Sequence, residues 1–320
     1  MNELIQAAEI ALRDCMALKA DETLLVLTDD STMDIGNVLF DVGKKMSKES
    51  AMVVIPERNV NGQEPPAEIA ELMTKYNAVI CPTSKSLTHT NARRNACKTG
   101  ARVATMPGIT EEVMIRTLKA DYHQIAKRTY QITKILDAAK QVHISTALGT
   151  DIMIPVQGIK AISSTGLVTE KGSFGNLPSG ESYLMPAEGQ TNGVFIVDGS
   201  FAGVGKIVEK PIRITVENGF AIKIEGGIEA SQLDNLLRPL GKKAYNAAEL
   251  GIGTNDQAIV TGEILEDEKV LGTVHIALGN NLSMGGTCDV GIHLDGVILE
   301  PTVIIDGRKI MDKGRLIGLI

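Results

Sequence analysis

Two histidines and two carboxylates in the last quarter of the chain have types and spacing that could bind a metal ion. His275 lies in the apolar run 272–279, which is typical of a buried strand. In a second apolar run, His293 and Asp295 are two residues apart, and residues i and i+2 of a strand point to the same face. Glu249 precedes both runs. Burying such groups costs free energy unless each has a partner, and a bound metal is the usual partner for such a set.

Other interpretations of these residues stay open. A single histidine in an apolar strand is more often a core histidine whose hydrogen bonds are satisfied, and Glu249 could equally end a helix on the solvent side. The pair of His293 and Asp295 favours a metal, because a dry strand face seldom carries both groups without a ligand. Imidazole and carboxylate ligands suit Zn, Mn, Co or Fe, whereas the absence of thiolates argues against a structural cysteine-based zinc site.

The elements that must position these residues follow two different patterns. In the first half, apolar runs that read as buried strands alternate with helix-like segments, with strands at 23–28, 51–55, 78–82 and 101–106 and helices near 34–48, 66–76 and 90–98. This alternation indicates βαβ units and a doubly wound parallel sheet. The turn at 28–31 lacks the glycine pattern of a dinucleotide-binding turn, so a nicotinamide or flavin cofactor is not expected.

The composition changes after a long helix expected at about 111–141. Only five of the 32 glycines precede residue 149, and the many later ones indicate the turns of a β-rich region. Hairpin turns are expected at 198–199, 218–219 and 306–307, and a helix at 229–250 with a break at Pro239. The fold class is therefore predicted to be α/β, with a doubly wound N-terminal domain over 1–142 and a β-rich α+β metal-site domain over 143–320.

Charge and composition limit the partners of this chain. A net charge of −7 argues against a nucleic-acid partner, whose phosphates need a basic surface. The four cysteines form no C-x-x-C pair, so neither a zinc knuckle nor a disulfide framework is indicated. The charged N-terminal segment does not fit a signal peptide, and no apolar stretch is long enough to span a membrane. A cytoplasmic protein without a membrane partner is expected.

Five short motifs give the chain a resemblance to the aminopeptidase T family. They occur in the family's order and are Asn176–Glu181, the segment around Glu249, Asp267–Lys269, His275–Gly279 and His293–Asp295. That family consists of dimeric metallo-aminopeptidases with an N-terminal α/β domain and a C-terminal metal domain. The resemblance implies a homodimer in which two divalent ions (Zn, Co or Mn) are held by Glu181, Glu249, His275, His293 and Asp295.

The reaction that this resemblance implies is removal of N-terminal residues from a peptide substrate. Two neighbouring metals would polarise the scissile carbonyl and activate a water molecule. A carboxylate near that water would be the general base, and Glu181 is the residue expected to act so, because it comes from a separate loop. The residues around it support a different interpretation by themselves, since a Gly/Pro-rich segment at 175–183 favours a surface turn.

Two departures from the aminopeptidase T pattern leave other functions open. Leu282 stands where that family has a tyrosine, and the segment between the two histidine motifs is shorter than usual. The chain is also similar to 2,5-dihydroxypyridine dioxygenases, which resemble aminopeptidase T but bind one ferrous ion. That alternative implies a two-histidine, one-carboxylate Fe(II) site of His275, His293 and Asp295. A third alternative is a non-catalytic small-molecule binding protein on the same fold.

Overall fold

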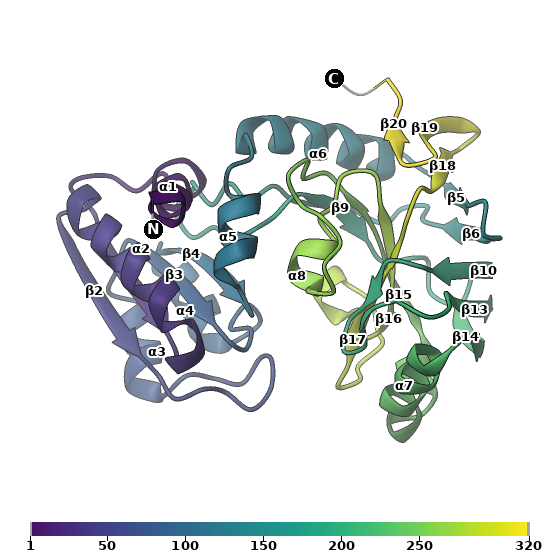
Figure 1. Ribbon diagram of the computed structural model, residues 1–320, viewed down its shortest axis with the longest axis horizontal. Coiled ribbons are helices and arrows are strands. Elements are labelled where there is room, and N and C mark those ends of the chain that lie inside the picture. Colours follow the sequence, from purple (N-terminus) through teal and green to yellow (C-terminus); the bar gives the residue numbers. More distant parts are fainter. Residues whose placement is uncertain (1, 319–320) are drawn as a thin grey trace. The chain divides into compact units, whose positions relative to one another are not determined.

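The computed structural model describes residues 2–318, and within them three β-sheets with flanking helices form a mixed α/β fold (Figure 1). The chain divides into two compact units. The first comprises Met1–Ala126 and Ser164–Ser179, and the second comprises Lys127–Ser163 and Gly180–Ile320. The mixed α/β fold with a parallel sheet and antiparallel sheets is as predicted. The finer division into domains at 142/143 stays a prediction.

The first unit is built on a five-stranded sheet whose neighbouring strands all run parallel. In sheet order its strands are β2 (Glu49–Val54), β1 (Thr23–Thr28), β3 (Ala78–Thr83), β4 (Arg102–Pro107) and β8 (Phe174–Asn176). All six residues of β3 are buried, which fits a central parallel strand covered on both faces.

Helices cover both faces of this parallel sheet. They are α1 (Asn2–Ile10), continued by a π-helical turn (Ala11–Cys15), then α2 (Met33–Met46), α3 (Ala67–Met73), α4 (Asn91–Lys98) and α5 (Glu111–Thr117). Residues of α3 and α4 pack in one apolar cluster with Leu25 and Leu27 of β1, whereas Gly43 of α2 lies against Leu24, on the opposite face of that strand. The alternation of strands and helices expected from the sequence is therefore present.

The long helix expected at 111–141 is wrong. The structure has α5, a break, α6 (Tyr122–Asp137) and then strand β5 from Gln141. The break has a local cause, because the Asp121 carboxylate accepts hydrogen bonds from the backbone N–H groups of His123 and Gln124 and so starts a new helix.

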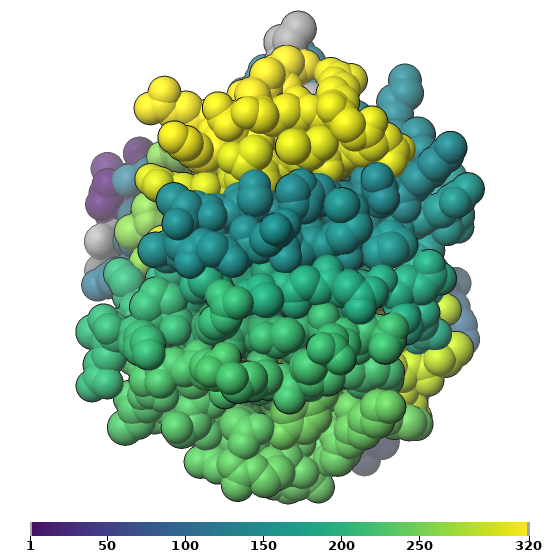
Figure 2. All heavy atoms as spheres, turned by 90° about the vertical axis from the view of Figure 1, so that its right-hand side faces the viewer, coloured from purple at the N-terminus to yellow at the C-terminus, as the bar shows by residue number. Residues whose placement is uncertain are grey.

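The second unit contains two β-sheets. The eight-stranded sheet has the order β14 (Phe220–Glu225), β13 (Ile212–Glu217), β10 (Asn192–Val197), β6 (Asp151–Pro155), β5 (Gln141–Ser145), β18 (Thr302–Ile305), β19 (Arg308–Asp312) and β20 (Arg315–Leu316). Figure 2 shows this order as bands, with the yellow C-terminal strands beside the teal strands and the green strands below them. The printed pairs of this sheet are antiparallel.

The seven-stranded sheet carries the candidate site. Its order is β12 (Gly205–Lys206), β11 (Ser200–Phe201), β17 (His293–Ile298), β16 (Val274–Gly279), β15 (Ala247–Gly253), β9 (Glu181–Leu184) and β7 (Ile162–Ser164). One face packs on the eight-stranded sheet in a shared apolar core, to which Leu250, Ile276 and Leu294 contribute. Because side chains alternate along a strand, the residues between them point to the other face.

Two of the three expected hairpin turns are confirmed. Asn218 and Gly219 join β13 to β14, and Asp306 and Gly307 join β18 to β19, all with positive φ as a two-residue turn requires. The expected hairpin at 198–199 is wrong, because β10 belongs to the eight-stranded sheet and β11 to the seven-stranded one.

The helix expected at 229–250 is less than half as long as predicted, and it ends just before the expected break at Pro239. Helix α7 covers Ile228–Leu237, two 3-10 turns (Arg238–Leu240 and Lys242–Tyr245) follow, and β15 begins at Ala247. Pro239 cannot continue an α-helix, and the residues after it pair with β9 and β16 instead. No helix in the described part of the chain is long and apolar enough to cross a membrane.

Candidate metal centre

The structure brings all five predicted site residues together on one face of the seven-stranded sheet. Four consecutive strands of the sheet supply them: Glu181 from β9, Glu249 from β15, His275 from β16, and His293 and Asp295 from β17. These positions alternate with the core residues of the same strands, which is why they share a face. All but His293 are buried, and its side chain is 32% exposed.

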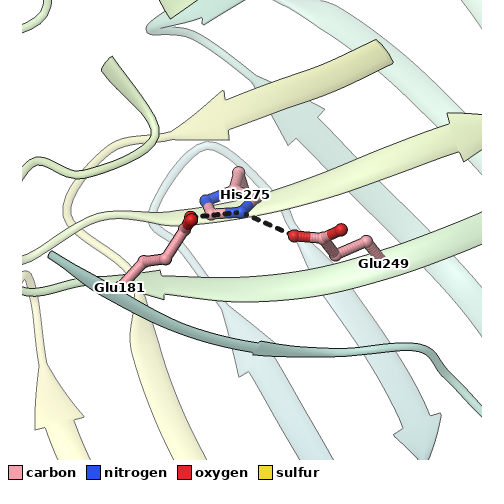
Figure 3. A group of neighbouring side chains, drawn as sticks. All are labelled: Glu181, Glu249 and His275. Atoms are coloured by element: carbon pink, nitrogen blue, oxygen red, sulfur yellow. Dashed lines mark hydrogen bonds and ion pairs between the residues drawn. The ribbon is translucent and has the colours of Figure 1, made fainter. Parts of the chain in front are cut away.

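One group of donors surrounds the ring of His275. Its Nε2 atom lies 3.4 Å from Oε2 of Glu181 and 3.3 Å from Oε1 of Glu249, and the two carboxylates point toward the ring from opposite sides (Figure 3). Glycine at position 251 makes room for this ring, because a Cβ atom there would lie 2.0 Å from Nε2 of His275.

A second group surrounds His293. Its Nε2 atom lies 3.4 Å from Oε2 of Glu249 and 3.4 Å from Oδ1 of Asp295. Glu249 therefore belongs to both groups and offers a different oxygen to each imidazole. In each group the three donor atoms lie within 4.8 Å of one another, so each could hold a metal ion.

These separations also fit donors that share one metal ion. Nitrogen and oxygen donors bound to one metal at about 2.0–2.2 Å are about 3.0–3.4 Å apart at octahedral or tetrahedral angles. Among the described residues, Oε2 of Glu181, Nδ1 of His275 and Oδ1 of Asp295 are buried without a hydrogen-bond partner. Buried polar atoms that lack a partner in the protein require another one, and a divalent cation would provide it for Oδ1 of Asp295.

His293 is oriented for a metal by the main chain. Its Nδ1 atom lies 2.7 Å from the carbonyl oxygen of Asn280, an acceptor only, so Nδ1 carries the proton and donates it. In the neutral ring this leaves the lone pair on Nε2, the atom that faces Glu249 and Asp295. Asn280 lies directly after β16, so the loop between the two histidine strands fixes the tautomer.

The charges of the centre act strongly on His275. Burial favours its neutral form, but the hydrogen bond to Glu249 and the charges of Glu181 and Asp295 outweigh burial and raise its pKa to about 9. Burial also raises the pKa of Glu181, although Lys269 and His275 oppose that shift. Without a metal, the protonated imidazole is thus the cation that these carboxylates attract.

In the second donor group, too, neighbouring charges outweigh burial in setting the pKa values. Burial opposes the charged forms of His293 and Asp295, yet their mutual attraction is larger, so the pKa of His293 is raised and that of Asp295 is lowered. Burial likewise opposes the charge of Glu249, but hydrogen bonds with His275 and His293 lower its pKa. A set of donors this rich in negative charge fits a divalent cation.

Two further charged residues, which the sequence did not single out as site residues, lie beside the centre. The ammonium group of Lys269 is 2.6 Å from Oε1 of Glu181 and also pairs with Oε1 of Glu268. Charge attraction from both carboxylates raises the pKa of Lys269 against the effect of burial, while burial raises the pKa of Glu268 to about 8. The motif Asp267–Lys269 was the only signal in the sequence, and it indicated no role.

This arrangement corrects two expectations from the sequence, one for the segment 175–183 and one for Glu249. The segment 175–183 is not a plain surface turn, because Glu181 is 6% exposed and begins a strand of the sheet. Glu249 does not end a helix on the solvent side either, since it is 7% exposed within β15. Both carboxylates are buried because the strands that carry them pair with each other.

Comparisons with known proteins give the family. A family model described as NicX, 2,5-dihydroxypyridine 5,6-dioxygenase, matches residues 3–318. A curated relative, the 2,5-dihydroxypyridine 5,6-dioxygenase of Pseudomonas putida strain KT2440, is 24% identical over 251 residues, which are 72% of this chain and 69% of the relative.

Two solved structures share the fold. The 2,5-dihydroxypyridine dioxygenase from Pseudomonas putida KT2440 superposes with a TM-score of 0.87 at 19% identity, covering 98% of this chain and 97% of that one. Wild-type AmpT from Thermus thermophilus has a TM-score of 0.71 at 17% identity, and 99% of each chain is covered.

These findings correct the function expected from the sequence. The chain is not identified as an aminopeptidase T, and the expected hydrolase or protease activity on a peptide substrate is wrong. The error has a physical reason: the same fold occurs in AmpT and in the dioxygenase, and imidazole and carboxylate donors suit a divalent metal in either reaction. The homodimer and the cytoplasmic location stay predictions. Because the family model spans residues 3–318, the chain belongs to the NicX family of 2,5-dihydroxypyridine 5,6-dioxygenases.

Proposed function

We propose that this chain is an Fe(II)-dependent dioxygenase that opens the ring of a dihydroxylated pyridine. The observation that carries the proposal is the set of two imidazoles and three carboxylates, all but His293 buried, on one sheet face in a chain of the NicX family. The substrate class follows from the name of the Pseudomonas putida relative, 2,5-dihydroxypyridine 5,6-dioxygenase.

In this proposal His275 of the first donor group joins His293 and Asp295 of the second and holds the iron with them, as a two-histidine, one-carboxylate set that leaves coordination positions open. Glu249 stands between the two imidazoles, within 3.3 and 3.4 Å of their Nε2 atoms, and adds negative charge at the same point. Ferrous iron in such a site would supply the redox chemistry through which dioxygen reacts with an aromatic ring.

Glu181 is the residue proposed to accept a proton from a substrate hydroxyl group. Its Oε2 atom is buried on the site face and has no hydrogen-bond partner within residues 2–318. Burial raises the pKa of this carboxyl group, which makes its ionised form a stronger base. Oε1 is held by Lys269, so proton transfer would involve Oε2.

The reaction balances without a further reductant. Cleavage at the 5,6 position breaks one carbon–carbon bond of the ring, and both atoms of one dioxygen molecule enter the product. Turnover is therefore expected to consume dioxygen and substrate in equal amounts.

We expect a His293→Ala variant to lose this reaction, because it removes one of the two imidazole donors. The protein is loaded with Fe(II) without oxygen, mixed with 2,5-dihydroxypyridine in aerated buffer, and followed with an oxygen electrode. His143→Ala is the matched control: His143 also lies on a strand and pairs with a carboxylate, Asp151, but in the other sheet of this unit.

The wild type and the His143 variant should consume oxygen at similar rates, whereas the His293 variant should consume none above background. A His293 variant as active as the wild type would contradict the assignment of this histidine. A wild type that takes up Fe(II) but leaves a set of dihydroxylated pyridines and oxygen unchanged would overturn the proposed function.

A further inference from the structure

Lys269 is a buried cation that contacts the centre without belonging to its donor set. Its side chain is 3% exposed, and its ammonium group pairs with Glu181 and Glu268. The backbone around it is fixed, because its carbonyl oxygen accepts a hydrogen bond of 2.8 Å from the N–H of Asn255. The side chain of Lys269 is therefore fixed at its backbone end and at its ammonium group.

The two oxygens of Glu181 have different surroundings. Oε1 accepts a hydrogen bond of 2.6 Å from Lys269, whereas Oε2 lies 3.4 Å from Nε2 of His275 and has no hydrogen-bond partner among the described residues. The same carboxylate also belongs to a donor group that could hold a metal, with Glu249 and His275. Glu181 is therefore within reach of two cations, the ammonium group and a metal ion.

A buried carboxylate needs a positive charge beside it, and it pairs with the nearest available cation. Removing one partner of a buried ion pair is strongly destabilising, because the remaining charge is left in a medium of low dielectric constant. Without the lysine, a metal bound by His275 would be the nearest cation available to Glu181. Lys269 and the metal therefore compete for this carboxylate.

We propose that Lys269 is a positioning residue that keeps Glu181 from binding the metal. It thereby leaves a coordination position open for substrate or oxygen, and it leaves Oε2 free to accept a proton. This inference rests on the proposed function, since it requires a metal held by His275, His293 and Asp295.

The test uses Co(II) as the only added ligand, because its visible absorption reports the number and type of its ligands. Four proteins are compared after titration with Co(II): the wild type, Lys269→Met, Glu181→Gln and the double variant with both changes. Lys309→Met is the matched control, because that lysine is half-exposed and pairs with Asp312 on β19, in the other sheet of this unit. Circular dichroism reports whether each variant is folded.

The expected result is a change in one protein only. Glu181→Gln should keep the wild-type Co(II) spectrum, because Glu181 is not a ligand while Lys269 holds it. Lys269→Met should show a shifted, weaker absorption as Glu181 joins the metal. The double variant should return to the wild-type spectrum, since the extra ligand is gone. A purely structural role for the lysine would not produce this return.

Each contrary result has a distinct meaning. An unchanged spectrum in folded Lys269→Met, or a changed one in Glu181→Gln, would overturn the positioning role while leaving the metal centre intact. If Lys269→Met does not fold, the comparison of Glu181→Gln with the wild type still decides whether Glu181 is a ligand. Failure of the wild type to bind Co(II) at all would overturn the metal centre itself, and the inference with it.

Discussion

Two carboxylates with little exposure, Glu249 and Glu22, use both of their oxygens. Glu249 offers Oε1 to His275 and Oε2 to His293. In the first unit, Glu22 offers its two oxygens to the two terminal nitrogens of Arg102, at 2.9 and 2.6 Å. A two-point contact fixes the plane of a carboxylate as well as its position, so it orients a charge that burial makes costly.

The pair of Glu22 and Arg102 gives a pH-dependent stability that does not depend on a metal. The hydrogen bonds and charge of Arg102 hold the pKa of Glu22 below its ordinary value, against a smaller effect of burial. A group whose pKa is lower in the folded state adds stability above its unfolded pKa, about 4.3 for glutamate. That stability is lost as the pH falls through the lowered value.

We therefore expect Glu22→Gln to lower the free energy of unfolding by about 1–3 kcal/mol at neutral pH. The difference from the wild type should shrink as the pH falls below about 4, where the wild-type carboxylate also becomes protonated. Urea titrations at several pH values measure it. Glu71→Gln is the control, because its pair with Lys75 is exposed and should matter little. A difference that stays constant down to acid pH would contradict this account.

Single residues of the site differed in how far the sequence could predict them. His293 and Asp295 could be found because a spacing of two within an apolar run needs no knowledge of distant contacts. Only the resemblance predicts Glu181 as a site residue, since a Gly/Pro-rich segment does not reveal that its acid pairs with a lysine 88 residues later. The role of Lys269 could not be found for the same reason.

At the level of elements, strand alternation builds the site. The four site strands are β9, β15, β16 and β17. Their apolar side chains point into the core between the two sheets, and the metal donors point to the opposite face. Glycine at position 251 is required by a close approach, because this residue stands opposite His275 in the strand pair and leaves space for its ring.

We expect Gly251→Ala to weaken metal binding by at least about tenfold, the scale seen when groups that orient metal ligands are changed. The added methyl group would displace the ring of His275 from the donor group. A Co(II) titration measures the dissociation constant. Gly291→Ala is the matched control, because a Cβ atom there meets nothing within 4 Å and the residue lies in the loop between β16 and β17. Equal affinity in both variants would show that the ring does not need this space.

Elements were predicted well where local signals decided them and poorly where pairing decided them. The parallel strands and the turns at 218–219 and 306–307 follow from apolar runs and from residues that accept positive φ. A helix is predicted over residues 247–250, but backbone pairing with β9 and β16 makes them a strand. The turn at 198–199 joins different sheets, which a local turn signal cannot indicate.

At the scale of the whole molecule, the fold does not decide the reaction. The same architecture superposes on a pyridine dioxygenase and on AmpT, over nearly the full length of each chain. Function must therefore be argued from the site and from the family to which the sequence belongs. Leu282 and the short segment before His293 depart from the aminopeptidase T pattern, whereas the five shared motifs belong to the fold and donors common to both proteins.

The most direct test of the central claim is the amount of dioxygen consumed for each ring opened by the Fe(II)-loaded protein. Substrate loss is followed by absorbance, and dissolved oxygen is measured in the same cell. The account predicts equal amounts of oxygen and 2,5-dihydroxypyridine consumed, with no ring opening under nitrogen. Ring opening that continues without oxygen, or no reaction of the iron-loaded protein in air, would contradict a dioxygenase.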